Sequence, residues 1–72
     1  MLPKYKVIYE DMKDKLKNHV YKPNEKIPDG GSLAIDYTCS KLTVAKALDL
    51  LVQEGMLIRR QGSGTYVKEN FP

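Results

Sequence analysis

The sequence has one cysteine, one histidine and no tryptophan among its 72 residues. Cys39 has no partner for an internal disulfide, and no cluster of cysteine and histidine has the spacing of metal ligands. No metal or cofactor is therefore predicted, and a lone thiol fits a reducing cytoplasm better than an oxidising compartment. Packing of Cys39 against the core is favoured over redox sensing.

Long apolar runs are also absent. No segment approaches the roughly 20 apolar residues that span a bilayer, and Lys4 places a charge too early for a signal peptide. A chain this short forms one small domain with little room for an enclosed substrate pocket. No arrangement of Ser, His and Asp, or of Cys and His, suggests a nucleophile with its base. We therefore expect neither an enzyme nor a membrane protein, and no catalytic residue is predicted.

Positive charge is only slightly in excess, with 12 Lys and Arg against 9 Asp and Glu and a net charge of +3. The basic residues predominate in 1–22 and 41–72, whereas 23–40 has more acidic residues than basic ones. Such a distribution permits a surface that faces phosphates but does not establish one.

Apolar residues at helical intervals indicate a first helix from about Lys4 to His19. Its inward face is predicted to contain Tyr5, Ile8, Tyr9, Met12, Leu16 and Val20. Residues 21–24 have the composition of a turn. Residues 25–27 are then predicted to form a very short strand, which Pro28 ends.

A second, short helix is predicted after Asp29, whose carboxylate can cap it. The residues expected to face the core are Leu33, Ala34 and Tyr37. Gly30 and Gly31 fall in the first turn, and each costs up to about 1 kcal/mol relative to alanine, so we expect that turn to be irregular. Residues 38–39 form the tight turn to the next helix.

Ser40 is predicted to cap a third helix, which Gly55 ends in the left-handed conformation. The apolar stripe of this helix consists of Val44, Ala47, Leu48, Leu51 and Val52. Residues 56–60 and 65–67 are predicted as the strands of a hairpin, because the glycines in 61–64 permit a tight turn.

Three helices followed by a hairpin make a winged helix-turn-helix, which is an α+β and mainly α fold. The predicted domain covers residues 1–68, and residues 69–72 are predicted to begin a linker. In this fold one helix commonly enters the major groove of DNA.

Three motifs carry a family resemblance: SKLTVAKAL at 40–48, EGML at 54–57 and RQGSGTYV at 60–67. With them, nearly the whole chain resembles the N-terminal DNA-binding domain of the GntR family of bacterial transcription regulators. The resemblance implies a ligand-responsive regulator, with a repressor favoured over an activator, on a palindromic operator in double-stranded DNA. It also implies a homodimer held by a C-terminal domain outside this chain, on which a small-molecule effector binds.

The resemblance places the third helix in the major groove and the wing in the minor groove. The DNA contacts predicted on this basis are Lys4, Tyr5, Ser40, Lys41, Leu42, Thr43, Ala45, Lys46, Arg60, Gln61, Gly62 and Ser63. Hydroxyls and amides at the helix N-terminus are good phosphate donors. Each residue also has a structural alternative: Ser40 as a cap, Tyr5 as a core residue, Lys46 as a solvated charge. Arg59 and Arg60 are predicted to point to opposite faces of their strand, so at most one faces phosphate.

Several charges typical of the family are missing. Family members often have arginine at the positions of Gly31, Lys41 and Ala45, and a basic residue at that of Ser63. Alanine cannot hydrogen-bond to guanine, and lysine does so less selectively than arginine. We therefore expect an A·T-leaning or low-affinity site, in which Leu42 and Ala45 pack on thymine methyl groups. A strict G·C core in a selection on randomised half-sites would contradict this hypothesis.

The missing arginines, the paired glycines and the outward Leu42 leave an alternative, a diverged winged helix that docks on another protein. Salt dependence separates the two functions, because phosphate contacts weaken steeply with salt. For the DNA-binding function we expect a cytoplasmic, nucleoid-associated location.

Overall fold

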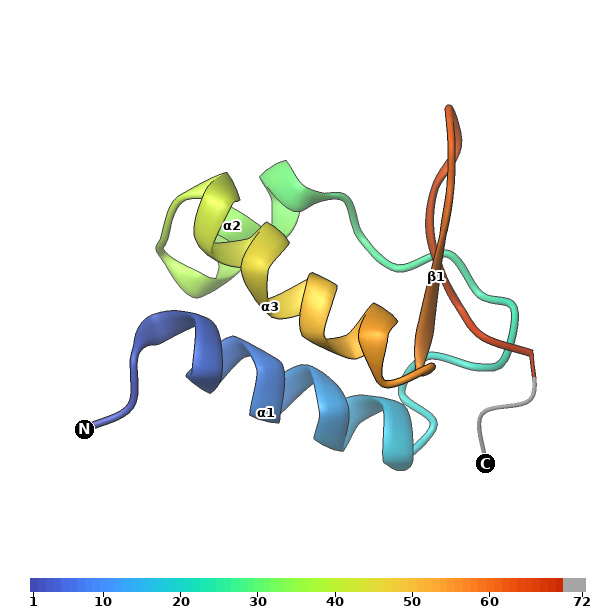
Figure 1. The fold of residues 1–72 in the computed structure, drawn as a ribbon, viewed down its shortest axis with the longest axis horizontal. Helices are drawn as coiled ribbons and strands as arrows, with labels where there is room; N and C mark the ends of the chain where they lie inside the picture. Colours follow the sequence, from blue (N-terminus) through green and yellow to red (C-terminus); the bar gives the residue numbers. More distant parts are fainter. Residues whose placement is uncertain (70–72) are drawn as a thin grey trace.

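The computed structural model describes residues 1–69, which form three helices followed by a β-hairpin (Figure 1). In chain order the elements are α1 (Lys4–Lys17), α2 (Gly30–Tyr37), α3 (Lys41–Gln53), β1 (Leu57–Arg60) and β2 (Gly64–Val67). The strands are antiparallel, with Leu57 opposite Val67 and Arg60 opposite Gly64. In Figure 1, α1 covers one side of α3 and the hairpin projects toward the other. The predicted winged helix-turn-helix is confirmed. Of the predicted linker at 69–72, only Glu69 is among the described residues.

The core lies where α1, α2, α3 and the base of the hairpin meet. The fully buried side chains include Ile8 and Met12 of α1 and Val44, Ala47 and Leu51 of α3. They recur every three or four residues, so each helix turns one apolar stripe inward. The predicted stripes are largely confirmed, although Val52 and Tyr5 are only partly buried. Within residues 1–69, no helix combines the length and apolar character that crossing a membrane would require.

The first helix is shorter than predicted, because it ends at Lys17 and not at His19. Asn18 is its C-cap, and His19 has a φ of +57°, in the left-handed region. The chain therefore leaves the helix direction before Val20, which is 58% exposed. The prediction that Val20 lies on the inward face is wrong, since a periodic pattern does not show where the backbone turns.

The second helix begins at Gly30 with a regular first turn. The carboxylate of Asp29 accepts a hydrogen bond of 2.7 Å from the amide of Ser32, and its carbonyl accepts one of 3.0 Å from the amide of Leu33. The predicted cap is confirmed, whereas the predicted irregular turn is wrong. These bonds satisfy amides that a helix start leaves unpaired, and this offsets the low helix propensity of glycine. Thr38 ends the helix with a φ of +55°.

The segment before α2 runs along the hairpin, where the short strand predicted at 25–27 is reduced to a single bridge. Lys26 forms a single antiparallel bridge with Tyr66. The amide of Ile27 donates to the carbonyl of Thr65 at 2.9 Å, and the amide of Val67 donates to that of Glu25 at 2.9 Å. This pairing ties the approach to α2 to the base of the wing. The wing strands themselves start one residue away from their predicted bounds.

Tyr37 connects α2 to α1. Its hydroxyl donates a hydrogen bond of 2.5 Å to Asp11, which also pairs with Lys15 at 3.3 Å. Burial, with the neighbouring carboxylate, raises the pKa of Tyr37 from 10.0 to about 12. The folded domain therefore favours the protonated phenol.

Alkaline pH is expected to destabilise the domain through Tyr37. A group whose pKa is raised on folding contributes stability below its unfolded pKa, and this is lost as the pH rises through the folded pKa. For Tyr37 the window runs from 10.0 to about 12. Urea unfolding followed by circular dichroism should show a larger loss of stability across this window for the wild type than for Tyr37→Phe. Equal losses in the two proteins would contradict the expectation.

Candidate nucleic-acid interface

Ser40 caps the N-terminus of α3, as predicted. Its hydroxyl accepts a hydrogen bond of 3.1 Å from the amide of Thr43 and lies 2.9 Å from the hydroxyl of Thr43. A helix N-terminus leaves its first amides without partners in the helix and carries a partial positive charge. The first turn of α3 is therefore suited to bind a phosphate oxygen.

The outer side of α3 is open. Lys41 is exposed, Leu42 is 83% exposed and Ala45 is partly exposed, whereas Val44 and Ala47 on the inner side are fully buried. The helix thus packs against the domain along one side only. Lys41 and Leu42 are open to solvent, and Ala45 is partly covered by the domain, so the start of this side of α3 is free to contact a duplex.

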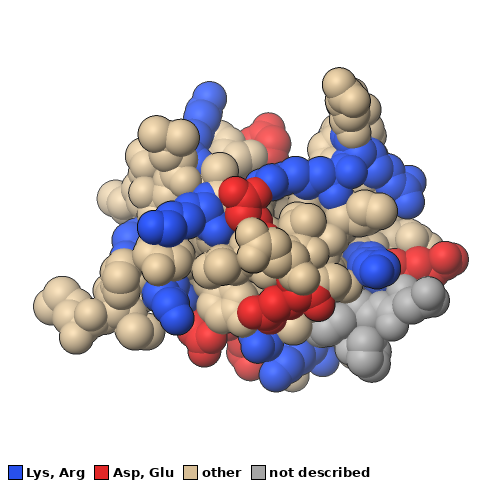
Figure 2. All heavy atoms as spheres, in the orientation of Figure 1, with Lys and Arg blue, Asp and Glu red and all other residues tan. Residues whose placement is uncertain are grey.

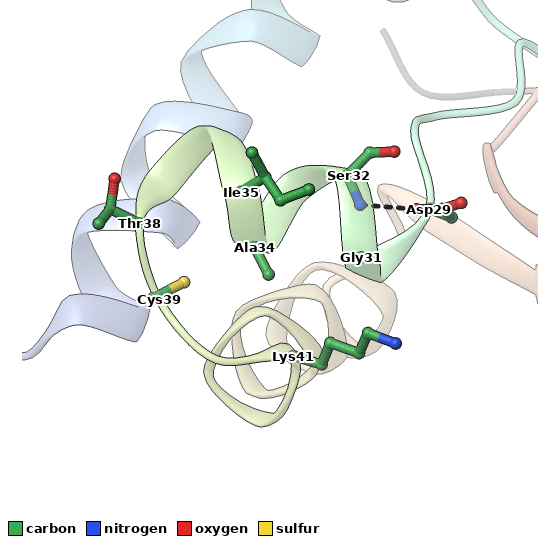
Figure 3. A pocket seen from close by; sticks show the side chains of 8 residues that line it. All are labelled: Asp29, Gly31, Ser32, Ala34, Ile35, Thr38, Cys39 and Lys41. Carbon is green, nitrogen blue, oxygen red and sulfur yellow. Dashed lines mark hydrogen bonds between the residues drawn. The ribbon is translucent and has the colours of Figure 1, made fainter.

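A surface hollow separates α2 from the start of α3 (Figure 3). Its lining consists of Asp29, Gly31, Ser32, Ala34, Ile35, Thr38, Cys39 and Lys41. The side chain of Lys41 lies along Gly31, with its Cε 3.4 Å from where a Cβ on that glycine would be. Lys41 also helps to lower the pKa of Asp29, after the larger effect of the hydrogen bonds from Ser32. Gly31 thus gives Lys41 space that a larger side chain would occupy.

Cys39 is half-buried and packs against the core at the edge of this hollow. This agrees with the packing role that the sequence favours for the thiol.

Lys46 and Tyr5 are in contact with each other. The Lys46 ammonium lies 4.1 Å from the centroid of the Tyr5 ring, a cation–π distance that links α3 to α1. Lys46 is therefore not simply a solvated charge. Lys4 is exposed in the same first turn of α1. The structure thus brings Lys46 and Tyr5 together, and Lys4 is the neighbour of Tyr5 in the chain.

The wing tip is formed by Gln61, Gly62 and Ser63, and all three residues are exposed. Ser63 and Tyr66 share a hydrogen bond between their hydroxyls, and the Arg60 guanidinium lies 4.8 Å from the centroid of the Tyr66 ring. In Figure 2 the tip is free of Lys and Arg side chains, which gather lower on the wing and over α3. The tip can therefore approach DNA with backbone and hydroxyl groups, but it has no charge of its own.

Arg59 is the side chain that the sequence analysis left out of the interface. Its Nη1 is paired with the carboxylate of Asp49, and its Nη2 lies 3.5 Å from the carbonyl oxygen of Ala45. Arg59 therefore lies beside α3, whereas Arg60 lies over Tyr66. The sequence does indicate this position of Arg59, because strand alternation puts it on the same face as Leu57, which is buried.

Residues 4–67 match a family model described as "Bacterial regulatory proteins, gntR family". The HTH-type transcriptional regulator GmuR of Bacillus subtilis (strain 168) is 44% identical over 64 residues, which cover 89% of this chain and 27% of that protein. The histidine utilization repressor of Klebsiella aerogenes is 34% identical over 67 residues, which cover 93% of this chain and 28% of that protein. The chain thus spans little more than a quarter of the length of these relatives.

Solved structures show the same fold bound to DNA. The AraR DNA-binding domain in complex with operator ORE1 superposes with a TM-score of 0.90 at 36% identity, covering 93% of this chain and 82% of that chain. The complex of the same domain with operator ORX1 has a TM-score of 0.90 at 36% identity, with coverages of 93% and 81%. The arrangement of three helices and a wing is therefore that of domains crystallised on operator DNA.

Proposed function

Since the chain belongs to the gntR family of bacterial regulatory proteins, we propose that it binds double-stranded operator DNA by inserting α3 into the major groove. The observation that carries the proposal is the one-sided packing of α3, whose outer residues Lys41 and Leu42 remain exposed. The similarity to AraR domains bound to operators supports it. The relatives are named as transcription regulators, and this domain is not an enzyme.

Each part of the interface has a role that follows from its chemistry. The hydroxyls of Ser40 and Thr43 and the first amides of α3 bind phosphate. Lys41 reaches the groove as a positive charge, and the methyl groups of Leu42 and Ala45 meet thymine methyl groups. Lys4, Tyr5 and Lys46 flank the helix toward the backbone. Arg60 and the wing tip, residues 61–63, lie along the minor groove.

The complete regulator is proposed to be a homodimer on a palindromic operator. A C-terminal domain holds the two copies together and binds a small-molecule effector, and the protein acts as a repressor in the cytoplasm, associated with the nucleoid. Two facts support this assembly: the chain spans 27% of GmuR, which leaves room for a further domain in such proteins, and a second relative is named a repressor. The protein-docking alternative is not favoured, because the similar structures include operator complexes.

Lys41→Gln is expected to weaken binding to a duplex selected from a randomised pool by about tenfold. If Lys41 meets a phosphate, the slope of log affinity against log salt also falls by about 1. Fluorescence anisotropy with the labelled duplex, measured from about 50 to 200 mM salt, gives both quantities.

The matched control is Lys17→Gln, which removes the same charge at the far end of α1. Its affinity should stay close to that of the wild type. Equal weakening by the two substitutions would contradict the role of Lys41. Salt-insensitive binding, or no binding to any duplex in the pool, would contradict the proposed function.

A further inference from the structure

Arg59 extends from β1 of the wing to α3. Leu57, two residues earlier on β1, is buried, so the alternation of strand side chains directs Arg59 toward α3. Two of its nitrogens are engaged there, one with the carboxylate of Asp49 and one at 3.5 Å from the carbonyl of Ala45. The other arginine of this strand, Arg60, lies over Tyr66. Arg59 is thus the wing cation that lies beside the exposed side of α3.

The position of this guanidinium is significant because of the residues around it. Lys41, Ala45 and Asp49 are four residues apart, so they form one row along the outer side of α3. This row begins with a positive charge and has only a methyl group at Ala45. The Arg59 guanidinium lies beside this row between Ala45 and Asp49, where the side chains of the helix itself provide no positive charge.

The chemistry of the pair fits binding better than stabilisation. The Asp49 and Arg59 side chains are 51% and 44% exposed, and an exposed ion pair adds little to the stability of a fold. Arginine has five N–H donors in a planar fork, and Asp49 and Ala45 use only part of that fork. The remaining donors match the geometry of a phosphate or of a guanine edge.

We propose that Arg59 is a DNA-contacting residue of the α3 surface, supplied by the wing, and that Asp49 is the residue that positions it. The inference rests on the proposed function. The positive charge of Arg59 offsets the repulsion between the Asp49 carboxylate and DNA phosphates. The ion pair also keeps the guanidinium beside Ala45, where the helix has no hydrogen-bonding side chain. Arg59 thereby provides a cation where the resemblance predicts an arginine on α3 itself.

The test compares Arg59→Met, which removes the guanidinium and keeps an unbranched apolar stem, with Asp49→Asn, which releases it. Each variant is titrated into two labelled duplexes: the one most enriched by the wild-type chain from a randomised pool, and a scrambled duplex of the same composition. Arg59→Met should bind the enriched duplex about tenfold more weakly, with a salt slope lower by about 1 if the contact is to phosphate. Asp49→Asn should bind the scrambled duplex more tightly and discriminate less between the two.

Urea unfolding tests whether each variant remains folded, and Lys17→Gln again controls for the lost charge. Arg59→Gln has the same expected result and replaces Arg59→Met if that variant does not fold. A second selection with the Arg59 variant separates the two kinds of contact: loss of a guanine preference at one position identifies a base edge, and an unchanged sequence with weaker binding identifies a phosphate. Both results support the proposal.

Two results would overturn it while leaving the proposed function intact. One is an Arg59 variant that binds both duplexes as the wild type does. The other is an equal loss in Arg59→Met and Asp49→Asn with an unchanged salt slope and unchanged base preferences, since that is the behaviour of a pair that only fixes the wing to α3. A wild-type chain that binds no duplex would overturn both proposals.

Discussion

Replacing Leu51 with alanine is expected to lower the free energy of unfolding by about 2–5 kcal/mol. Leu51 is fully buried on the inner side of α3, in the cluster that also includes Met12 of α1 and Leu57 of β1. Domains of this size lie near the lower end of the usual range of about 5–15 kcal/mol, so the substitution removes a large part of the stability. Urea unfolding followed by circular dichroism measures the difference.

The same helix offers a matched control, because Leu42 is 83% exposed. Leu42→Ala makes the same chemical change on the outer side and should alter stability by no more than about 0.5 kcal/mol. If Leu42 packs on thymine methyl groups, this variant should instead bind the selected duplex more weakly. Similar destabilisation by both substitutions would show that α3 does not have one buried side and one free side.

Joining two copies of the chain is expected to raise the affinity for a palindromic duplex by about 10²–10⁴-fold over a single copy. The second copy then binds its half-site in an intramolecular step, at an effective concentration set by the linker. A flexible Gly/Ser linker allows both α3 helices to reach major grooves one helical turn apart, about 34–36 Å. Fluorescence anisotropy with a palindrome built from the enriched half-site measures the gain.

A duplex with the half-sites moved apart by about half a turn is the control for this gain. It places the second half-site on the opposite face of the DNA, so the linked copies should lose most of their advantage. If the linked and single chains have the same affinity for the palindrome, or the two spacings give the same gain, the proposed dimeric arrangement on the operator is wrong.

Much of the fold could be predicted because the relevant interactions are local. Asp29 and Ser40 accept hydrogen bonds from amides three residues ahead, and Gly55 adopts a φ of +79° at the end of α3. Such caps involve only residues that are close in the chain, so the residue types at these positions predict them. The apolar stripes follow from the geometry of the helix itself.

The wrong predictions concern features that depend on more than a few consecutive residues. Val20 continues the spacing of α1 but follows the residue at which the backbone turns, His19. The first turn of α2 is regular because its cap offsets two glycines, a balance of two opposing effects that composition alone does not resolve.

For the interface, the amino-acid pattern is enough to show that α3 has one apolar side, that its start is capped and that the wing tip lacks charge. The packing of the folded domain places Lys46 over the Tyr5 ring and Arg59, rather than Arg60, beside Asp49. The Lys46–Tyr5 contact joins α3 to α1, which are far apart in the chain, and the Arg59–Asp49 contact joins two consecutive elements, α3 and β1. The Arg59 contact depends on how the hairpin packs against α3. Leu57 and Val67, which are paired at the base of the hairpin, are both buried. The alternation of a strand separates its two faces, but packing alone determines which face meets the helix.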